Sequence, residues 1–238
     1  MPVDKVYPSC AEAVADIPDG ATIMSGGFGG GGVPTHLLLA LRDQGTKGLT
    51  VIANSTGLGE KVAKKIGRPA ISDVAVLVEN GQIRKAIASI PVSLSPSFPS
   101  EFEKLLLQGK VEVEALPQGT MCERMRIAAA GLGGFYTPTG VGTKVEEGKE
   151  KRVFDGQEYI LEKPLRADYA LINAHKADRM GNLVYKGTSR NFSPLMAAAA
   201  RVTIVQAENI VEIGELDPGE IITPGVYVDR IVQVPCSD

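Results

Sequence analysis

A loop near the N-terminus carries six glycines in the seven positions from 26 to 32, and no other feature constrains the fold of this chain more strongly. An apolar run covers residues 21–25 in front of the loop, and a helical pattern begins behind it at Pro34. Glycine loses more conformational entropy on folding than any other residue, so a loop this rich in it indicates a special backbone shape or a close approach. We therefore expect a strand, a tightly bent loop and a helix in succession.

Short apolar runs alternate with helical patterns along most of the chain, which is typical of an α/β fold with a parallel sheet covered on both faces. Proline suits the first position of the first helix and Gly45 suits its end. We predict one domain over residues 1–238, with a mixed, mainly parallel sheet flanked by helices. The expected strands are 21–25, 49–53, 83–89, 110–116, 167–174, 201–207 and 225–234, and the expected helices are 34–45, 58–66, a short one within 96–109, 121–130 and 194–200.

The segment 144–163 differs from its surroundings, because it is highly charged. Its Asp155-Gly156 pair is a strong signal for a tight hairpin turn. We therefore predict an exposed, protruding β-hairpin arm of two strands here rather than a linker between domains.

Composition excludes several classes of protein. The chain has 238 residues with a net charge of −3, and it has no run of Lys and Arg that would follow a nucleic-acid backbone. No stretch of 18 apolar residues predicts a membrane span, and no apolar segment near the N-terminus predicts a signal peptide. Cys10, Cys122 and Cys236 are too widely spaced to predict disulfides or a metal site, so we expect no metal and a cytoplasmic location.

The glycine loop admits several interpretations. Loop amides followed by a helix N-terminus can bind an anion, and Gly27, Gly29 and Gly32 match the G-x-G-x-x-G dinucleotide fingerprint. That match is weak, because the second strand ends at Asn54-Ser55 without the carboxylate that a ribose requires. An NAD(P)-dependent oxidoreductase, a sugar-phosphate-binding module and a tight connection that binds nothing remain as alternatives.

Six motifs in order give the chain a resemblance to a known family. Together they resemble the A (alpha) subunit of the family I 3-oxoacid CoA-transferases, of the acetate/acetoacetyl or 3-oxoadipate type, over nearly the whole length. The motifs are "DGATIMSGGFGGGGVP" at 19–34, "PQGTMCERMR" at 117–126, "GGFYTPTGVGT" at 133–143, "LRADYALINAHKADRMGN" at 165–182, "SRNFSPLMAAAA" at 189–200 and "GELDPGEIITPGVYVDRIV" at 214–232.

The resemblance implies coenzyme A as the carrier in the reaction, with no tightly bound cofactor. Family members transfer CoA between carboxylic acids through a glutamyl-CoA thioester formed on the enzyme. The backbone of the glycine loop is then expected to face CoA. The residues concerned are Gly26, Gly27, Phe28, Gly29, Gly30, Gly31 and Gly32.

The same resemblance assigns a catalytic role to Gln118. The family's oxyanion glutamine lies in the same Pro-Gln-Gly-Thr motif, and a neutral amide donor suits that role. The family's nucleophilic glutamate lies on the B (beta) subunit, in a Ser-Glu-Asn-Gly motif after a strand. The "VENG" stretch that contains Glu79 has valine where the family motif has serine, and it precedes a strand instead of following one. We therefore expect the nucleophile on a partner chain, the beta subunit, and a hetero-oligomer of the two chains.

Asn54 and Ser55 are candidates for substrate binding, because they end a strand where parallel sheets bind ligands. Many relatives carry two amide or acidic residues there, and Ser55 departs from that pattern. The segment 89–102 is expected beside the acyl group, and it contains no cation, which favours a monocarboxylic acceptor. Arg84 and Lys85 are the nearest cations.

The remaining polar candidates are expected to be structural. His175, Lys176 and Asp178 favour packing and salt bridges at a strand end over acid–base chemistry. His36 is expected to face solvent, and residues 190–191 are expected to make structural hydrogen bonds rather than to meet CoA phosphates.

Overall fold

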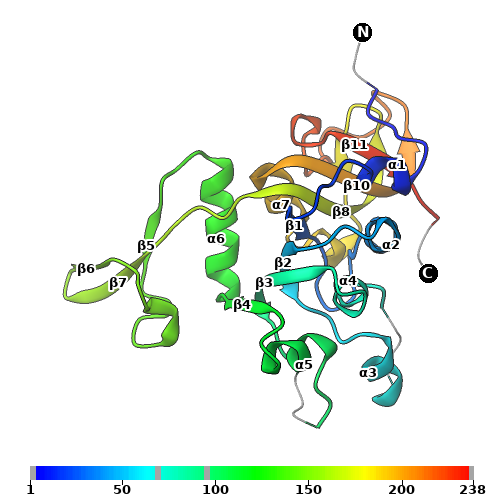
Figure 1. Ribbon diagram of the computed structural model, residues 1–238. Helices are drawn as coiled ribbons and strands as arrows, with labels where there is room; N and C mark the ends of the chain where they lie inside the picture. The colour runs from blue at the N-terminus through cyan, green and yellow to red at the C-terminus, as the bar shows by residue number, and fades with distance from the viewer. Residues whose placement is uncertain (1–3, 68–70, 94–96, 236–238) are drawn as a thin grey trace.

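The core of the protein is an eight-stranded sheet, seen in the computed structural model that describes residues 4–67, 71–93 and 97–235 (Figure 1). Seven strands run parallel in the order β11-β10-β8-β1-β2-β3-β4, and β9 pairs antiparallel with β8. The predicted α/β class with a mixed, mainly parallel sheet is confirmed. The strands are β1 Thr22–Ser25, β2 Leu49–Ser55, β3 Ile83–Ile90, β4 Glu112–Ala115, β8 Ala167–Asp178, β9 Leu183–Val184, β10 Ala200–Val211 and β11 Arg230–Gln233.

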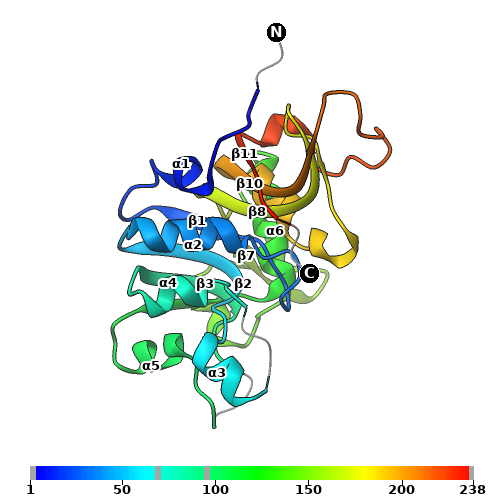
Figure 2. The same cartoon turned by 90° about the vertical axis from the view of Figure 1, so that its right-hand side faces the viewer.

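Helices cover both faces of this sheet. Figures 1 and 2 show α6 on the opposite side of the sheet from α2 and α4. Helices α1, α2, α4 and α5 contribute to one buried apolar cluster, and α6 and α7 contribute to the other. The helices are α1 Cys10–Val14, α2 Thr35–Gln44, α3 Glu60–Lys65, α4 Ala75–Glu79, α5 Glu101–Leu107, α6 Gln118–Ala129 and α7 Ser193–Ala199, with 3₁₀ turns at Lys144–Glu146, Gly187–Arg190 and Gly225–Tyr227.

Successive residues of the central strands enter opposite clusters. In β1, Ile23 packs in the α2 cluster and Met24 in the α6 cluster, and in β2 Val51 and Ile52 divide in the same way. Side chains alternate between the faces of a strand, so a strand buried on both faces is expected to be apolar at most positions. This is why the middle of each of these strands is mainly apolar in the sequence, with Thr50 as a buried polar exception in β2.

Most predicted elements are present, with several differences in extent. Helices α1 and α4 were not predicted from the sequence, and each has only five residues. The predicted strand 225–234 begins instead with a 3₁₀ turn and becomes β11 only at Arg230. Within the described ranges, no helix is long and apolar enough to cross a bilayer.

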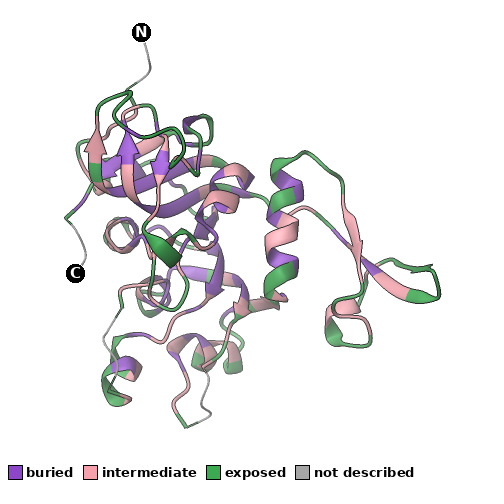
Figure 3. Ribbon diagram, turned by 180° about the vertical axis from the view of Figure 1, so that it is seen from behind, coloured by how far each residue is buried: buried purple, intermediate pink, exposed green. Residues whose placement is uncertain are grey.

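An arm projects from the α6 side of the molecule (Figures 1 and 3). The hairpin predicted within 144–163 is confirmed as β6 and β7, and a third strand from outside that segment, β5, extends the arm to a three-stranded antiparallel sheet in the order β5-β7-β6. The turn at Asp155 and Gly156 has positive φ at both residues, as the sequence predicted. The third strand was missed because it is only three residues long and comes from the 133–143 motif. The strands are β5 Phe135–Thr137, β6 Lys151–Phe154 and β7 Gln157–Glu162.

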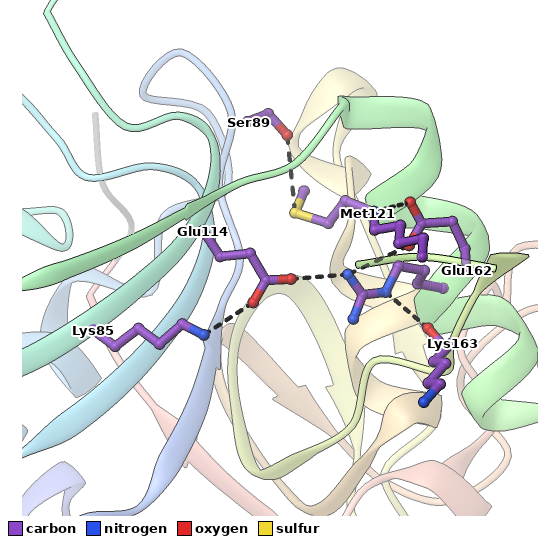
Figure 4. A network of polar contacts seen from close by, with 8 residues as sticks. Lys85, Ser89, Glu114, Met121, Glu162 and Lys163 are labelled. Carbon is purple, nitrogen blue, oxygen red and sulfur yellow. Dashed lines mark hydrogen bonds and ion pairs between the residues drawn. The ribbon is translucent and has the colours of Figure 1, made fainter. Parts of the chain in front are cut away.

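A network of charged groups ties the arm to helix α6 and to the sheet (Figure 4). Arg124 of α6 lies 3.0 Å from Glu114 of β4 and 3.7 Å from Glu162, whose side chain is 1% exposed at the base of the arm. Lys85 binds Glu114 from the sheet at 2.9 Å, and Lys149 binds Glu162. Burial alone would raise the pKa of Glu114, but the hydrogen bonds from Lys85 and Arg124 hold it below its usual value.

Replacing Arg124 with methionine will lower the free energy of unfolding by about 2 kcal/mol, because it leaves Glu162 buried with one cation instead of two. Arg126 provides a matched control two residues further along α6. Its pair with Glu123 is exposed, with side chains 63% and 42% accessible, so R126M should change stability by less than about 0.5 kcal/mol. Urea unfolding measures both, and equal losses would contradict a structural role for the Arg124 network.

Candidate active site

The candidate residues gather at one edge of the parallel sheet. Strands β1 and β2 pair in parallel with Ser25 opposite Ala53, so the glycine loop and Asn54 leave the sheet side by side. Strand β2 also pairs in parallel with β3, which places Ser55 opposite Ile90. Ligands of open parallel sheets bind at this carboxyl edge.

The glycine loop folds back on itself in a tight turn. Phe28 and Gly31 exchange two backbone hydrogen bonds of 3.0 Å, and between them Gly29 and Gly30 both have positive φ. This is the backbone of a type I′ turn, which residues other than glycine, Asn and Asp rarely adopt. The N–H groups of Gly29 and Gly30 make no hydrogen bond to a described residue, and both residues line the cavities of the site.

Asn191, which is distant in the sequence, hydrogen-bonds to both sides of this loop. Its Oδ1 accepts from the Gly27 N–H at 3.2 Å, and its Nδ2 donates to the Gly31 carbonyl at 3.1 Å. The next residue, Phe192, packs its ring 6.3 Å from that of Phe28. The structural role predicted for Asn191 is therefore confirmed.

The N-terminus of α2 is hydrogen-bonded within the protein, which argues against one part of the anion-site hypothesis. The backbone N–H groups of His36 and Leu37 donate to Gln206 Oε1 at 2.9 and 3.2 Å, and Thr35 N–H donates to the Val33 carbonyl. Gln206 is buried in β10 and is held in turn by Asn173. The backbone N–H groups at this helix end are thus hydrogen-bonded inside the protein. They are not available to bind phosphate, as the helix N-terminus of a dinucleotide site does.

Gln118 contacts the site through Asn54. It is the first residue of α6, after Pro117, and its side chain is close enough for Nε2 to donate to Asn54 Oδ1 at 2.8 Å. Asn54 is buried at the end of β2, so its oxygen fixes one N–H of the Gln118 amide. The amide has a second N–H, which makes no hydrogen bond to any described residue.

Two adjoining cavities lie at this edge of the sheet. The glycine turn, Asn54 and Ser55 line both of them, and the larger has a volume of about 420 Å³. That volume lies within the range of small-molecule sites. The structure thus brings together the glycine turn, Asn54, Ser55 and Gln118, while their chemical roles stay predictions.

Ile90, Val92 and Ser93 also line the larger cavity, and they belong to the segment expected beside an acyl group. Residues 94–96 of that segment lie outside the described residues. Arg84 and Lys85 are engaged elsewhere, in pairs with Glu112 and Glu114.

The other polar candidates lie outside this site. His175 pairs with Glu208 at 2.7 Å, and Asp178 accepts hydrogen bonds within the turn that follows β8, in agreement with the structural roles predicted for them. Glu79 ends α4 ahead of β3, also as predicted. His36 is half-buried rather than facing solvent.

Metal ligands are not grouped in the part of the chain that the structure describes: no three His, Cys, Asp or Glu side chains gather there in a way that could hold an ion. Cys10 and Cys122 are free thiols. Cys236 falls outside the described residues.

Asp73 is a lining residue that the sequence analysis missed. It lies just before α4, and its Oδ1 accepts the Ala75 N–H at 2.9 Å. Burial raises the pKa of the Asp73 carboxyl, and the nearby Glu79 raises it further. Ser-Asp before an apolar run is a helix-start signal that could have predicted α4, but it carries no information about the cavity.

The fold and the site define a class of protein, and comparison identifies it. The sequence matches the coenzyme A transferase family model over residues 7–234, so this chain belongs to the coenzyme A transferase family. It is 48% identical to the A subunit of 3-oxoadipate CoA-transferase from Pseudomonas putida, over 98% of this chain and 94% of that protein. It is 45% identical to the alpha subunit of acetate CoA-transferase from Escherichia coli K12, over 93% of each.

A solved structure gives the same result. An acyl-CoA transferase of E. coli O157:H7 (YdiF), solved as a thioester complex with CoA, matches with a TM-score of 0.80 and 25% identity. The match covers 98% of this chain and 50% of that one, so this chain spans half the length of that enzyme. These relatives give no support to the oxidoreductase or sugar-phosphate alternatives.

Proposed function

We propose that this chain is the A (alpha) subunit of a heteromeric CoA-transferase. The enzyme moves CoA from an acyl-CoA such as succinyl-CoA or acetyl-CoA to a short 3-oxoacid or fatty acid, and a separate beta subunit carries the nucleophilic glutamate. Relatives named as the A or alpha subunit of such enzymes, matched over nearly their full length, support this division. We further propose one domain over 1–238, a cytoplasmic location and no tightly bound cofactor.

The reaction conserves the free energy of the thioester. The partner's glutamate carboxylate attacks the acyl-CoA carbonyl carbon, the C–S bond breaks, and CoA thiolate leaves a mixed anhydride behind. The thiolate then attacks the glutamyl carbonyl of the anhydride, and the donor acid departs as a carboxylate. The acceptor acid repeats these two steps in reverse on the glutamyl-CoA thioester.

In this scheme Gln118 stabilises the negative charge that develops on the carbonyl oxygen at each attack. The observation that carries the proposal is its hydrogen bond to Asn54, a residue that lines the cavity of the glycine turn, because this bond uses one amide N–H of Gln118 and leaves the other for the oxyanion. A donor fixed in advance needs no reorganisation as charge develops. The backbone of residues 26–32 then forms the wall against which CoA passes, with Asn54 and Ser55 next to the acyl group.

The isolated chain should show no CoA transfer, and addition of its cognate beta subunit should restore it. Formation of acyl-CoA from acetyl-CoA and a panel of acids, followed by chromatography, measures this. A Glu79→Gln chain should be restored equally well, because the proposal places the nucleophile on the partner. Full transfer by this chain alone would contradict the two-chain division.

A further inference from the structure

Asn191 holds a backbone shape that glycine adopts more readily. Its φ of +28° and ψ of −118° lie outside the main regions that residues with a Cβ occupy. Among the residues that the structure describes, the only other non-glycine residue with a positive φ is Asp155, in the hairpin turn of the arm. Aspartate is common in such a hairpin turn, whereas Asn191 lies between a 3₁₀ turn and α7. A strained backbone that is retained in this way points to a role for the side chain.

The side chain of Asn191 uses its full hydrogen-bonding capacity. Its Oδ1 accepts from the N–H groups of Gly27 and Phe192, at 3.2 and 2.7 Å. Its Nδ2 donates to the carbonyls of Gly31 and Ser189, at 3.1 and 2.9 Å. A carboxamide has two N–H donors and an oxygen with two lone pairs, so an aspartate of the same shape cannot replace both halves. The side chain thus joins the glycine loop to the segment that enters α7.

Two of these hydrogen bonds fix the glycine turn on either side of its tip. Gly27 and Gly31 flank residues 28–30, and these three residues line the larger cavity of the site. Glycine has no side chain that could anchor the tip by packing, and its backbone has more conformational freedom to lose than that of any other residue. Attachment on both sides therefore selects one shape of the turn before a ligand arrives, and such preorganisation lowers the entropic cost of binding.

We propose that Asn191 is a positioning residue of the transferase, which holds the glycine turn in the shape that receives acyl-CoA. This rests on the proposed function, because there the turn forms the wall against which CoA passes. Glycine at position 191 would relieve the backbone strain but would leave the turn unattached. The strain at Asn191 is therefore retained for the site rather than for the fold.

Asn191→Gly tests this assignment in the enzyme assembled with its cognate beta subunit, at a saturating concentration of acceptor acid. We expect the KM for acetyl-CoA to rise about tenfold, because a turn that adopts the competent shape about one tenth of the time binds correspondingly more weakly. The kcat should stay within about twofold of wild type, since saturating acyl-CoA restores the shape. The thermal midpoint should stay within about 3 °C, because relief of strain offsets part of the lost hydrogen bonding.

Asp155→Gly is the matched control. It also puts glycine in place of a residue with positive φ, but on the exposed arm, so KM and kcat should both stay within about twofold of wild type. Hydrogen–deuterium exchange of the unliganded enzyme gives a second measurement. Residues 26–32 should exchange faster in Asn191→Gly than in wild type, and acetyl-CoA should slow them again.

Asn191→Asp covers the case in which Asn191→Gly does not fold. It keeps the oxygen that accepts from Gly27 but sets a carboxylate oxygen against the Gly31 carbonyl, so it should raise KM in the same direction. A KM within about twofold of wild type in the variant that folds, or unchanged exchange of residues 26–32, would overturn the positioning role. Failure of both variants to fold would assign Asn191 to the fold and overturn it equally.

Absence of transfer by the wild-type assembly to every acid would instead overturn the proposed function. The exchange of residues 26–32 would then decide separately whether Asn191 holds the glycine turn, because that measurement does not depend on turnover.

Discussion

Gln118→Ala will lower kcat about a hundredfold in the enzyme assembled with its beta subunit. Removal of one preorganised oxyanion donor typically has an effect of this size, equivalent to about 2.7 kcal/mol of transition-state stabilisation. KM should change little, because the donor acts on charge that develops only in the transition state. Steady-state rates of acyl-CoA formation measure both constants.

Gln108 offers a matched control for that substitution. It is an exposed glutamine at the end of α5, and Gln108→Ala should leave both constants unchanged. Asn54→Ala should also lower kcat, because the Gln118 amide loses its orienting acceptor, and the double variant should be no slower than Gln118→Ala alone. A kcat near that of the wild type in Gln118→Ala would remove this residue from the oxyanion role.

Gly32→Ala should destabilise the protein by about 3 kcal/mol. Gly32 has φ of +70°, and a Cβ there would lie 2.2 Å from the Ser189 carbonyl oxygen and 2.6 Å from Asn191 Nδ2. A non-glycine residue in the left-handed region costs about 1–2 kcal/mol, and the clash with backbone adds a similar amount. The substitution would also displace Asn191 from the loop that it holds.

Gly31→Ala is the neighbouring control. A Cβ on Gly31 would meet its nearest atom, the Phe28 carbonyl oxygen, at an ordinary 3.6 Å, and its φ is not in the left-handed region. Thermal and urea unfolding should therefore show a much smaller loss for Gly31→Ala, within about 1 kcal/mol. Equal losses for the two variants would mean that the loop is held differently.

Several features of the fold were predictable because they depend on neighbouring residues. The runs around Ile23 and Val51 are apolar on both faces, and this identified them as strands of a covered parallel sheet. Proline before α2 and Gly45 after it marked that helix, because each suits the backbone at its end. Short helices such as α4 carry too few residues to show a period, and they were missed.

The candidate site was predictable only in part. The carboxyl ends of parallel strands bind ligands, so Asn54 and Ser55 were expected at a binding edge of the sheet, and the motif containing Gln118 pointed to CoA-transfer chemistry. The interpretation in which the α2 N-terminus binds an anion is not supported, because Gln206 of β10 accepts hydrogen bonds from its N–H groups, and the sequence does not show this contact.

The sequence by itself determined the α/β alternation of most strands and helices, the need for a glycine turn and the family, since all three depend on local patterns and motifs. The tertiary structure decided what surrounds that turn. Asn191 hydrogen-bonds to Gly27, 164 residues away in the sequence, and Gln206 hydrogen-bonds to His36, 170 residues away. Asp73 lines the cavity. Such contacts depend on how distant segments pack, and no local preference of the backbone specifies them.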